Sequence, residues 1–310
     1  MRTALFALVL VLAGCAHRET PSEPQPIAAV DIDEAAIRDA WAARIVGLDR
    51  LWARVTVVVR TVDAEGESVR EQAEGHLQIE QPRGVALGLG KLGETYLYLG
   101  SNDERYWWID RVDSDNRVAI VGRHELVTPR KAASLGVPVH PLGLIELLGI
   151  QALPEDVEFE PGPEPGTIAA VRTFAQDGPA GRSARLTWIL DAESYEPRRV
   201  TVFDSDGQIA IDAAHEAYQF ASVRGDTRLR PRVPGRLMVE IPGIPASVRF
   251  ALYDPENKPI KPVAFDADRL FRAFRVGEVI DLDAEVSAAG DFAQGMARTL
   301  TAPAENGPDE

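Results

Sequence analysis

The sequence predicts a mainly β (α+β) fold: an incomplete, strongly curved antiparallel β-barrel of about 10–12 strands with an N-terminal helix and internal lid helices. In residues 51–123, apolar and polar side chains alternate through successive segments separated by turn residues. Val55, Val57 and Val59, for example, alternate with Arg54, Thr56 and Arg60. Similar patterns return after residue 167, and an almost wholly apolar segment lies between the two regions. Period-two alternation is typical of strands that bury one face.

Composition places the chain among folded proteins and limits its partners. The 310 residues are 45% hydrophobic and 26% charged, with a formal net charge of −15. This length allows a core of useful size. So much negative charge repels nucleic acid and anionic lipid surfaces, so we expect no nucleic-acid partner and no basic membrane-binding patch.

Residues 1–14 have the pattern of a lipoprotein signal peptide. Arg2 precedes an apolar stretch too short to span a bilayer, and Leu12-Ala13-Gly14-Cys15 matches the lipobox of bacterial lipoproteins. The match implies cleavage before Cys15, the chain's single cysteine, and lipidation of its sulfur. By analogy with enteric bacteria, Ala16 indicates sorting to the outer membrane, with the domain facing the periplasm. A plain secretion signal with an incidental cysteine is the alternative.

Residues 15–34 are expected to be a lipidated N-terminus and flexible tether, because they contain three prolines and little to bury. The folded domain is expected over residues 35–283. It begins with a helix on which Ile37, Trp41, Ile45 and Leu48 recur at helical spacing, after an acidic first turn. Residues 284–310 are predicted to be an acidic, disordered tail.

The centre of the chain carries the expected lid. A short helix is predicted over 128–136, followed by a stiff proline-containing connector. Residues 142–150 are then apolar except for Glu146, so this segment is either buried on all sides or faces an apolar cavity. Near the C-terminus we expect an irregular stretch, along which the apolar residues are Phe265, Leu270, Phe271 and Phe274.

Motifs that carry chemistry are weak. Residues 88–93 fit GxGxxG, but a strand pattern follows where a dinucleotide site needs a helix. The histidines have no metal-ligand spacing, and there is no GxSxG nucleophile motif. We therefore expect no catalytic residue, no metal, no cofactor and no enzyme, with a hydrolase built on an unrecognised carboxylate pair as a distant alternative.

Aromatic and aliphatic side chains on the predicted strands and lid form a candidate cavity for acyl chains. Tyr96 and Tyr98 share one face of their strand, and Trp108 shares a face with Tyr106 on the next strand. Ordinary core filling is the alternative for each of them. The candidate cavity residues are Tyr96, Tyr98, Trp108, Leu142, Leu144, Ile145, Leu147, Leu148 and Trp188.

Three segments together resemble the outer-membrane lipoprotein receptor of the lipoprotein-localisation (Lol) system and, more distantly, its soluble carrier (LolB and LolA). They are the helix-to-strand transition over 41–60, the sequence VALGLGKLGETYLYL over 85–99, and GVPVHPL over 136–142 running into the apolar segment. The resemblance implies an incomplete barrel with internal helices. It also implies that Leu92 occupies a loop position that assists membrane insertion, although Lys91 replaces the family's proline.

These observations predict a lipoprotein of the outer membrane, anchored by its N-terminal lipid. We expect it to bind acyl chains of lipoproteins or lipids in an apolar cavity, in lipoprotein localisation or related envelope lipid trafficking. A periplasmic lipoprotein carrier is an implied partner. The alternative from another class is a structural or sensory envelope lipoprotein whose barrel is filled with side chains and which acts through a protein partner.

Overall fold

A computed structural model describes residues 31–62, 66–91, 93–111, 117–126, 141–175, 183–204, 206–242 and 246–284. Its elements in chain order are α1 (Glu34–Ile45), β1 (Arg50–Val62), β2 (Ser68–Glu80), β3 (Gly84–Lys91), β4 (Glu94–Ser101), β5 (Arg105–Asp110), β6 (Val118–Arg123), the 3-10 helix η1 (His124–Leu126), α3 (Pro141–Leu148), β7 (Glu158–Pro161), β8 (Thr167–Ala175), β9 (Ser183–Asp191), β10 (Pro197–Phe203), β11 (Ile209–Glu216), β12 (Gln219–Phe220), β13 (Ser222–Val223), β14 (Arg232–Val233), β15 (Arg236–Glu240), β16 (Ser247–Asn257), the 3-10 helix η2 (Pro262–Phe265), α4 (Ala267–Phe274) and β17 (Glu278–Asp281).

Across the described residues, fifteen strands form one curved sheet. Its order is β17-β6-β5-β4-β3-β2-β1-β16-β15-β11-β10-β9-β8-β7, with β13 paired to β16, while β12 and β14 form a separate pair. The two end strands, β17 and β7, do not neighbour each other in this order, so the sheet is not closed. The incomplete barrel predicted from the sequence is therefore confirmed.

Two details of that prediction need correction. The estimate of about 10–12 strands is too low, because it missed short strands such as β12, β13 and β14. The sheet is also not wholly antiparallel, since β17 pairs with β6 and β13 pairs with β16 in parallel. Strands of two to four residues are too short to show an alternation in sequence.

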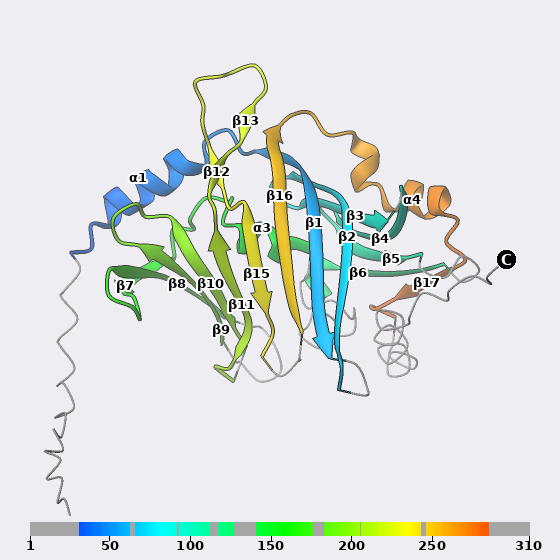
Figure 1. Cartoon of the computed structure of the whole chain (residues 1–310), viewed down its shortest axis with the longest axis horizontal. Helices are drawn as coiled ribbons and strands as arrows, with labels where there is room; N and C mark the ends of the chain where they lie inside the picture. The colour runs from blue at the N-terminus through cyan, green and yellow to red at the C-terminus, as the bar shows by residue number, and fades with distance from the viewer. Residues whose placement is uncertain are drawn as a thin grey trace, which may run out of the picture.

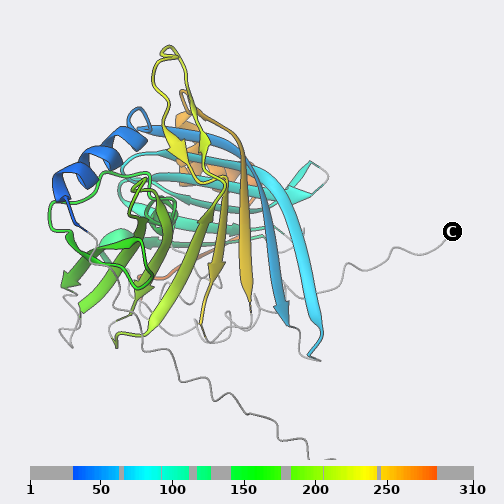
Figure 2. The same cartoon turned by 60° about the vertical axis from the view of Figure 1, so that its left-hand side comes forward.

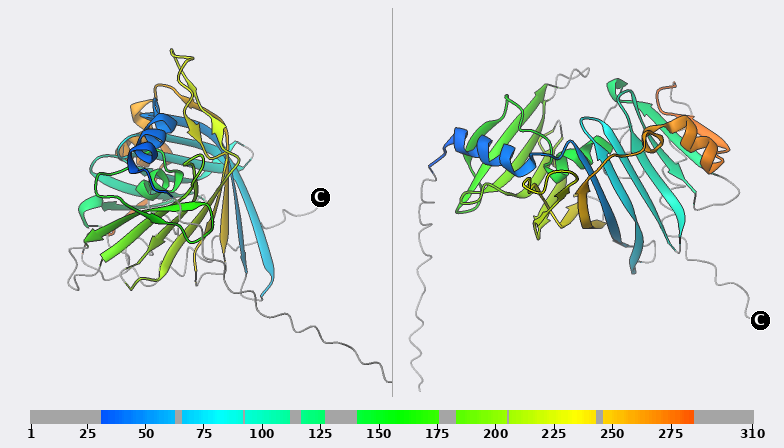
Figure 3. Two further views of the ribbon diagram at one scale, coloured as in Figure 1. Left: turned by 90° about the vertical axis from the view of Figure 1, so that its left-hand side faces the viewer. Right: turned by 90° about the horizontal axis from the view of Figure 1, so that it is seen from above.

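The sheet curves around α3, and two other helices lie outside that space (Figures 1 and 2). Seen from above, α1 lies over one half of the barrel and α4 beyond the other half (Figure 3). The long strands β1, β2 and β16 run from the end near α1 to the opposite end, which we call the open end (Figure 1).

Alternation along the strands separates a concave face from an outer face. On β1, Leu51, Ala53, Val55 and Val57 are buried in the main core, and Arg54 between them is exposed. On the outer face, α4 and η2 pack over β3–β6 on a second cluster. Its buried members are Ala86, Tyr98, Trp107, Ile109, Ala119, Ala264, Ala267 and Leu270.

The helix at the start of the domain forms as predicted. The Asp33 carboxylate accepts a hydrogen bond from the Ala36 amide at 3.0 Å, which caps the first turn. Ile37 and Trp41 are buried, but the helix ends at Ile45, so Leu48, which was expected on the helix, lies beyond its end. In contrast, the stretch expected to be irregular contains α4, which is capped by Asp266 through the Arg269 amide.

Several predictions fall on residues that the structure does not describe. These are the signal peptide and lipobox with Cys15, the tether up to residue 30, the loop residue Leu92, the helix over 128–136 and the tail from residue 285. They stay predictions. No helix within the described ranges is both long and apolar enough to cross a membrane.

Candidate functional site

The apolar segment predicted as a lid is α3, and it lies on the concave side of the sheet. Pro141, Leu144, Ile145, Leu147 and Leu148 are its buried residues. All but Pro141 belong to the main core, which also contains Trp108 and Trp188. The structure therefore brings together six of the nine predicted cavity residues. It buries their side chains among other protein groups, because none of the six is more than 5% exposed.

A second side of α3 is less covered. Leu142, Gly143 and Glu146 are half-buried and lie at helical spacing, so they share one face. Burial raises the pKa of the Glu146 carboxyl above its usual range, and the positive charge of Arg172 opposes this shift. The alternation on β8 puts Arg172 and Phe174 on the concave face with Ile168 and Ala170. The Glu146 face of α3 therefore points toward the open-end half of the concave face.

That half of the concave face carries apolar side chains that the core does not fully cover. They lie where the strands end away from α1, and cross-strand pairing joins Val59 to Val248 and Val202 to Ile211. Each is half-buried and packs against the main core on one side. We call this set the open-end surface, and it comprises Val59, Phe174, Val202, Ile211, Val248 and Phe250.

Side chains from four other parts of the fold hold the C-terminal end of α3. The last carbonyls of a helix have no partner within it, so they need donors from elsewhere. Here the donor and acceptor pairs are Trp188 Nε1 to Glu146 O (3.5 Å), His215 Nε2 to Leu147 O (2.5 Å), Arg44 Nη2 to Gly149 O (2.5 Å) and Gln81 Nε2 to Ile150 O (2.8 Å). The C-terminal end of α3 is thus a fixed part of the core.

His215 gives this arrangement a pH dependence. Burial lowers the pKa of His215 to about 4, and the nearby charge of Arg44 acts in the same direction. The unfolded chain takes up a proton near the ordinary value of about 6.5, so the unfolded state gains protons first as the pH falls. Stability contributed by neutral His215 is therefore complete above about pH 6.5 and is lost as the pH falls toward 4.

We expect this group to lower the free energy of unfolding by about 2 kcal/mol between pH 7 and pH 5. Urea unfolding of the wild type and of His215→Gln at both pH values measures it. The variant is less stable at pH 7 but should lose about 2 kcal/mol less on acidification. Equal losses in the two proteins would contradict the assignment.

Tyr98 and Tyr96 lie apart from the other predicted cavity residues. Tyr98 belongs to the outer-face cluster, where its hydroxyl donates to the Ala264 carbonyl at 2.9 Å. Burial raises the pKa of Tyr98. Tyr96 is half-buried and shares the parity of Tyr98 along β4, whereas Leu97 and Leu99 pack with the main core. The register explains the separation, because Tyr98 pairs with Ile109 and not with Trp108.

Sequence reasoning missed the open-end surface. Phe250 and Val248 alternate with Arg249 and Ala251, and Val202 follows Val200, so the signal for an apolar face was present. What the sequence lacks is the depth of each residue within the curved sheet. That depth decides which apolar residues the core covers.

The described residues contain no group of three or more histidine, cysteine, aspartate or glutamate side chains arranged to hold a metal ion. The glycines of the GxGxxG stretch serve the strands instead. Gly88 pairs with Tyr98, and a register shift in the β3–β4 ladder falls between Leu89 and Gly90. A side-chain carbon on Gly90 would lie 1.7 Å from the Glu94 carbonyl oxygen, so this position requires glycine.

No family model matches the chain, and no curated protein matches it in sequence. Its fold is similar to that of a LolA superfamily protein. That structure, from Nitrosomonas europaea, has a TM-score of 0.46 and 11% identity over 77% of this chain and 99% of the other. A domain described as an outer membrane lipoprotein-sorting protein, from Vibrio parahaemolyticus, has a TM-score of 0.44 and 12% identity over 76% and 97%. A DUF1329 family protein from Desulfovibrio piger has a TM-score of 0.44 and 11% identity over 76% and 98%.

Proposed function

We propose that this chain is a non-enzymatic, lipid-anchored binding protein that holds acyl chains of lipoproteins or lipids on the concave face of its sheet. The acyl chain would lie on the open-end surface and against the Leu142–Glu146 side of α3. The observation that carries this proposal is an apolar concave surface left half-exposed beside a helix whose end is held in place. Half-exposed apolar groups gathered on a concave face favour an apolar ligand.

The driving force is apolar burial. Each methylene removed from water contributes about 0.8 kcal/mol, so about ten methylenes supply roughly 8 kcal/mol before the costs of association. The raised pKa of Glu146 helps, because a carboxyl that protonates readily costs less to cover with hydrocarbon.

The anchoring belongs to the same proposal. A lipid on Cys15 would hold the protein at the outer membrane with its domain in the periplasm, where a periplasmic lipoprotein carrier would be a partner. Lipoprotein localisation, or a related step of envelope lipid trafficking, is the process in which such a protein would act. Leu92, if it holds the role that the resemblance implies, would assist the transfer of the acyl chain into the membrane.

Titration with a fluorescent fatty acid tests the binding site. We expect the full-length protein to bind the probe, and Phe250→Ser to weaken binding at least tenfold, because Phe250 lies on the open-end surface. Phe220→Ser is the matched control, since Phe220 is 52% exposed and lies on the separate β12–β14 pair. The control should bind as the wild type does. Equal affinity in all three proteins would place the probe elsewhere.

The alternative is a structural or sensory lipoprotein whose barrel interior is filled and which acts through a protein partner. The burial of Leu144, Ile145, Leu147 and Leu148, all at most 3% exposed, favours it for the half of the barrel near α1. A wild-type protein that binds no acyl probe, and yields no lipid when extracted from its native membrane, would establish this alternative.

A further inference from the structure

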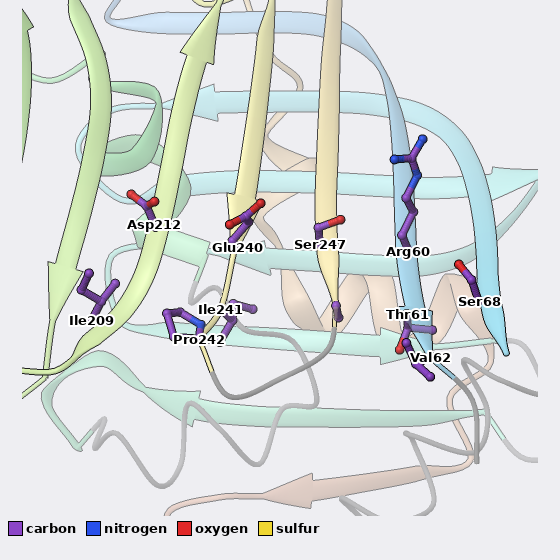
Figure 4. Close-up of a pocket in the computed structure, with 11 residues that line it drawn as sticks. Arg60, Thr61, Val62, Ser68, Ile209, Asp212, Glu240, Ile241, Pro242 and Ser247 are labelled. Atoms are coloured by element: carbon purple, nitrogen blue, oxygen red, sulfur yellow. The ribbon is translucent and has the colours of Figure 1, made fainter. Parts of the chain in front are cut away.

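Two neighbouring pockets lie on the outer face of the sheet, on the opposite side from the proposed acyl site. One of about 570 Å³ lies near the open ends of β1, β11, β15 and β16 (Figure 4). The other, of about 470 Å³, lies over β8–β11, and Ile209 lines both. Because Ile209 lines both, the two pockets adjoin each other, and we call the pair the outer-face groove.

A polar row crosses this groove. Cross-strand pairing links its members one to the next over six neighbouring strands, from β9 to β1. Each member lines one of the two pockets. In order, the polar row is Thr187, Thr201, Asp212, Glu240, Ser247 and Arg60.

The polar row faces away from the core. Its sequence neighbours Trp188, Val200, Ala213 and Val239 are core residues on the concave face, and successive side chains along a strand point to opposite faces. Nearer the strand ends, apolar residues accompany the row (Figure 4). This apolar edge comprises Val62, Phe203, Ile209, Ile241 and Pro242, of which Ile209 is 42% and Val62 is 43% exposed.

The length of the row limits what fits it. Neighbouring strands lie about 4.8 Å apart, so six strands span roughly 24 Å from the first member to the last. An extended polypeptide advances about 3.4 Å per residue, so about seven residues cover that span. Successive side chains of an extended polypeptide point to opposite sides of its backbone. A segment that lies along the groove can therefore place polar side chains against the polar row and apolar side chains against the apolar edge.

The charges specify the occupant further. Asp212 already has partners, since Thr201 Oγ1 donates to its carboxylate at 3.2 Å and Arg199 Nε lies 3.6 Å away. The Glu240 side chain is exposed and has no hydrogen bond or ion pair with another described residue, and the same is true of the Arg60 side chain at the end of the row. A basic side chain of the occupant near Glu240 would pair with the free carboxylate, and an acidic group would suit Arg60.

A saccharide chain fits less well. Sugar rings pack against open aromatic faces, and among the described residues Phe203 is the single aromatic side chain that lines either pocket. The Arg185 guanidinium already lies over its ring, 4.0 Å from the centroid.

We propose that the outer-face groove binds an extended polypeptide segment of about seven residues, alternately apolar and polar, with a basic side chain placed against Glu240. This interaction is separate from acyl binding, because the two sites lie on opposite faces of the sheet. A protein with both sites would hold an acyl chain on one face and recognise a polypeptide on the other.

The test uses full-length protein in dodecyl maltoside micelles and a fluorescein-labelled nine-residue peptide that alternates leucine and threonine around a central lysine. We expect saturable binding by fluorescence anisotropy, weakened at least tenfold by Glu240→Lys. A second peptide with a central glutamate should show the reverse preference and bind Glu240→Lys more tightly than the wild type. Glu278→Lys, an equal charge change on the distant strand β17, should leave both affinities unchanged.

Absence of saturable binding to the wild type would overturn the proposal, and so would equal affinities of the two peptides for the wild type and for Glu240→Lys. A linear hexasaccharide of N-acetylglucosamine that binds where the peptides do not would identify a saccharide site and also overturn it. Loss of fatty-acid binding bears only on the concave face, so the two proposals fail independently.

Discussion

Trp188→Ala is expected to lower the free energy of unfolding by about 3–5 kcal/mol. The Trp188 side chain is 0% exposed and lies between α1 and α3. Its ring meets the edge of Trp41 with centroids 6.0 Å apart, and its indole N–H donates to the Glu146 carbonyl. Alanine would leave a cavity at the junction of two helices and the sheet, and the surrounding side chains cannot collapse to fill it. Urea unfolding followed by far-UV circular dichroism measures the loss.

Trp52→Ala is the matched control, because Trp52 is half-buried on the outer face of β1, against His76 and Lys258. It should cost about 1 kcal/mol, as expected where little apolar area is covered. If Trp188→Ala instead costs no more than the control and changes fatty-acid affinity, Trp188 lines an acyl cavity. The sequence made that interpretation reasonable, and the burial of Trp188 argues against it.

Gly75→Ala should cost about 3 kcal/mol, at the upper end of what an inserted methyl group costs in a filled space. A side-chain carbon at Gly75 would lie 1.8 Å from the Gly88 carbonyl oxygen and 2.8 Å from its carbon. Both atoms belong to the backbone of β3, so relief requires β2 and β3 to separate. Rotation of a side chain is not enough. Thermal unfolding should show a lower midpoint.

Gly88→Ala serves as the control on the same pair of strands. There the nearest atoms are those of the Tyr98 ring, at 3.4 Å and 3.6 Å, which is ordinary contact. We expect a loss below about 1 kcal/mol, since the substitution needs little movement. If the two variants were equally stable, the close approach of the strands at Gly75 would be wrong.

Much of the fold could be predicted because long strands such as β1 and β2 bury one face, and such burial produces a period of two in the sequence. Helix α4 was missed because Phe265, Leu270, Phe271 and Phe274 are spread over a 3-10 helix and an eight-residue helix. In so short a helix, few positions are available to show a period. Capping by Asp266 was the usable signal.

The site could be predicted only in part. The apolar run of α3 indicated a helix buried in the barrel, and the structure has it there. The residues that hold its end come from far along the chain: Arg44 is 105 residues from Gly149, and His215 is 68 from Leu147. No local pattern marks such partners. The separation of Tyr98 from Trp108 likewise depends on the register between β4 and β5, which alternation within each strand does not determine.

The open strand order has a mechanical consequence. In a closed barrel, strand number and stagger determine the radius, and widening it breaks hydrogen bonds. Among the described strands, β7 and β17 end the order and form no ladder with each other. Small changes in twist between neighbouring strands can therefore change the width of the concave space while every backbone hydrogen bond is retained. Acyl chains of different thickness, if bound as proposed, would meet a sheet whose curvature can adjust opposite a helix whose end stays in place, and their release would require no loss of strand pairing.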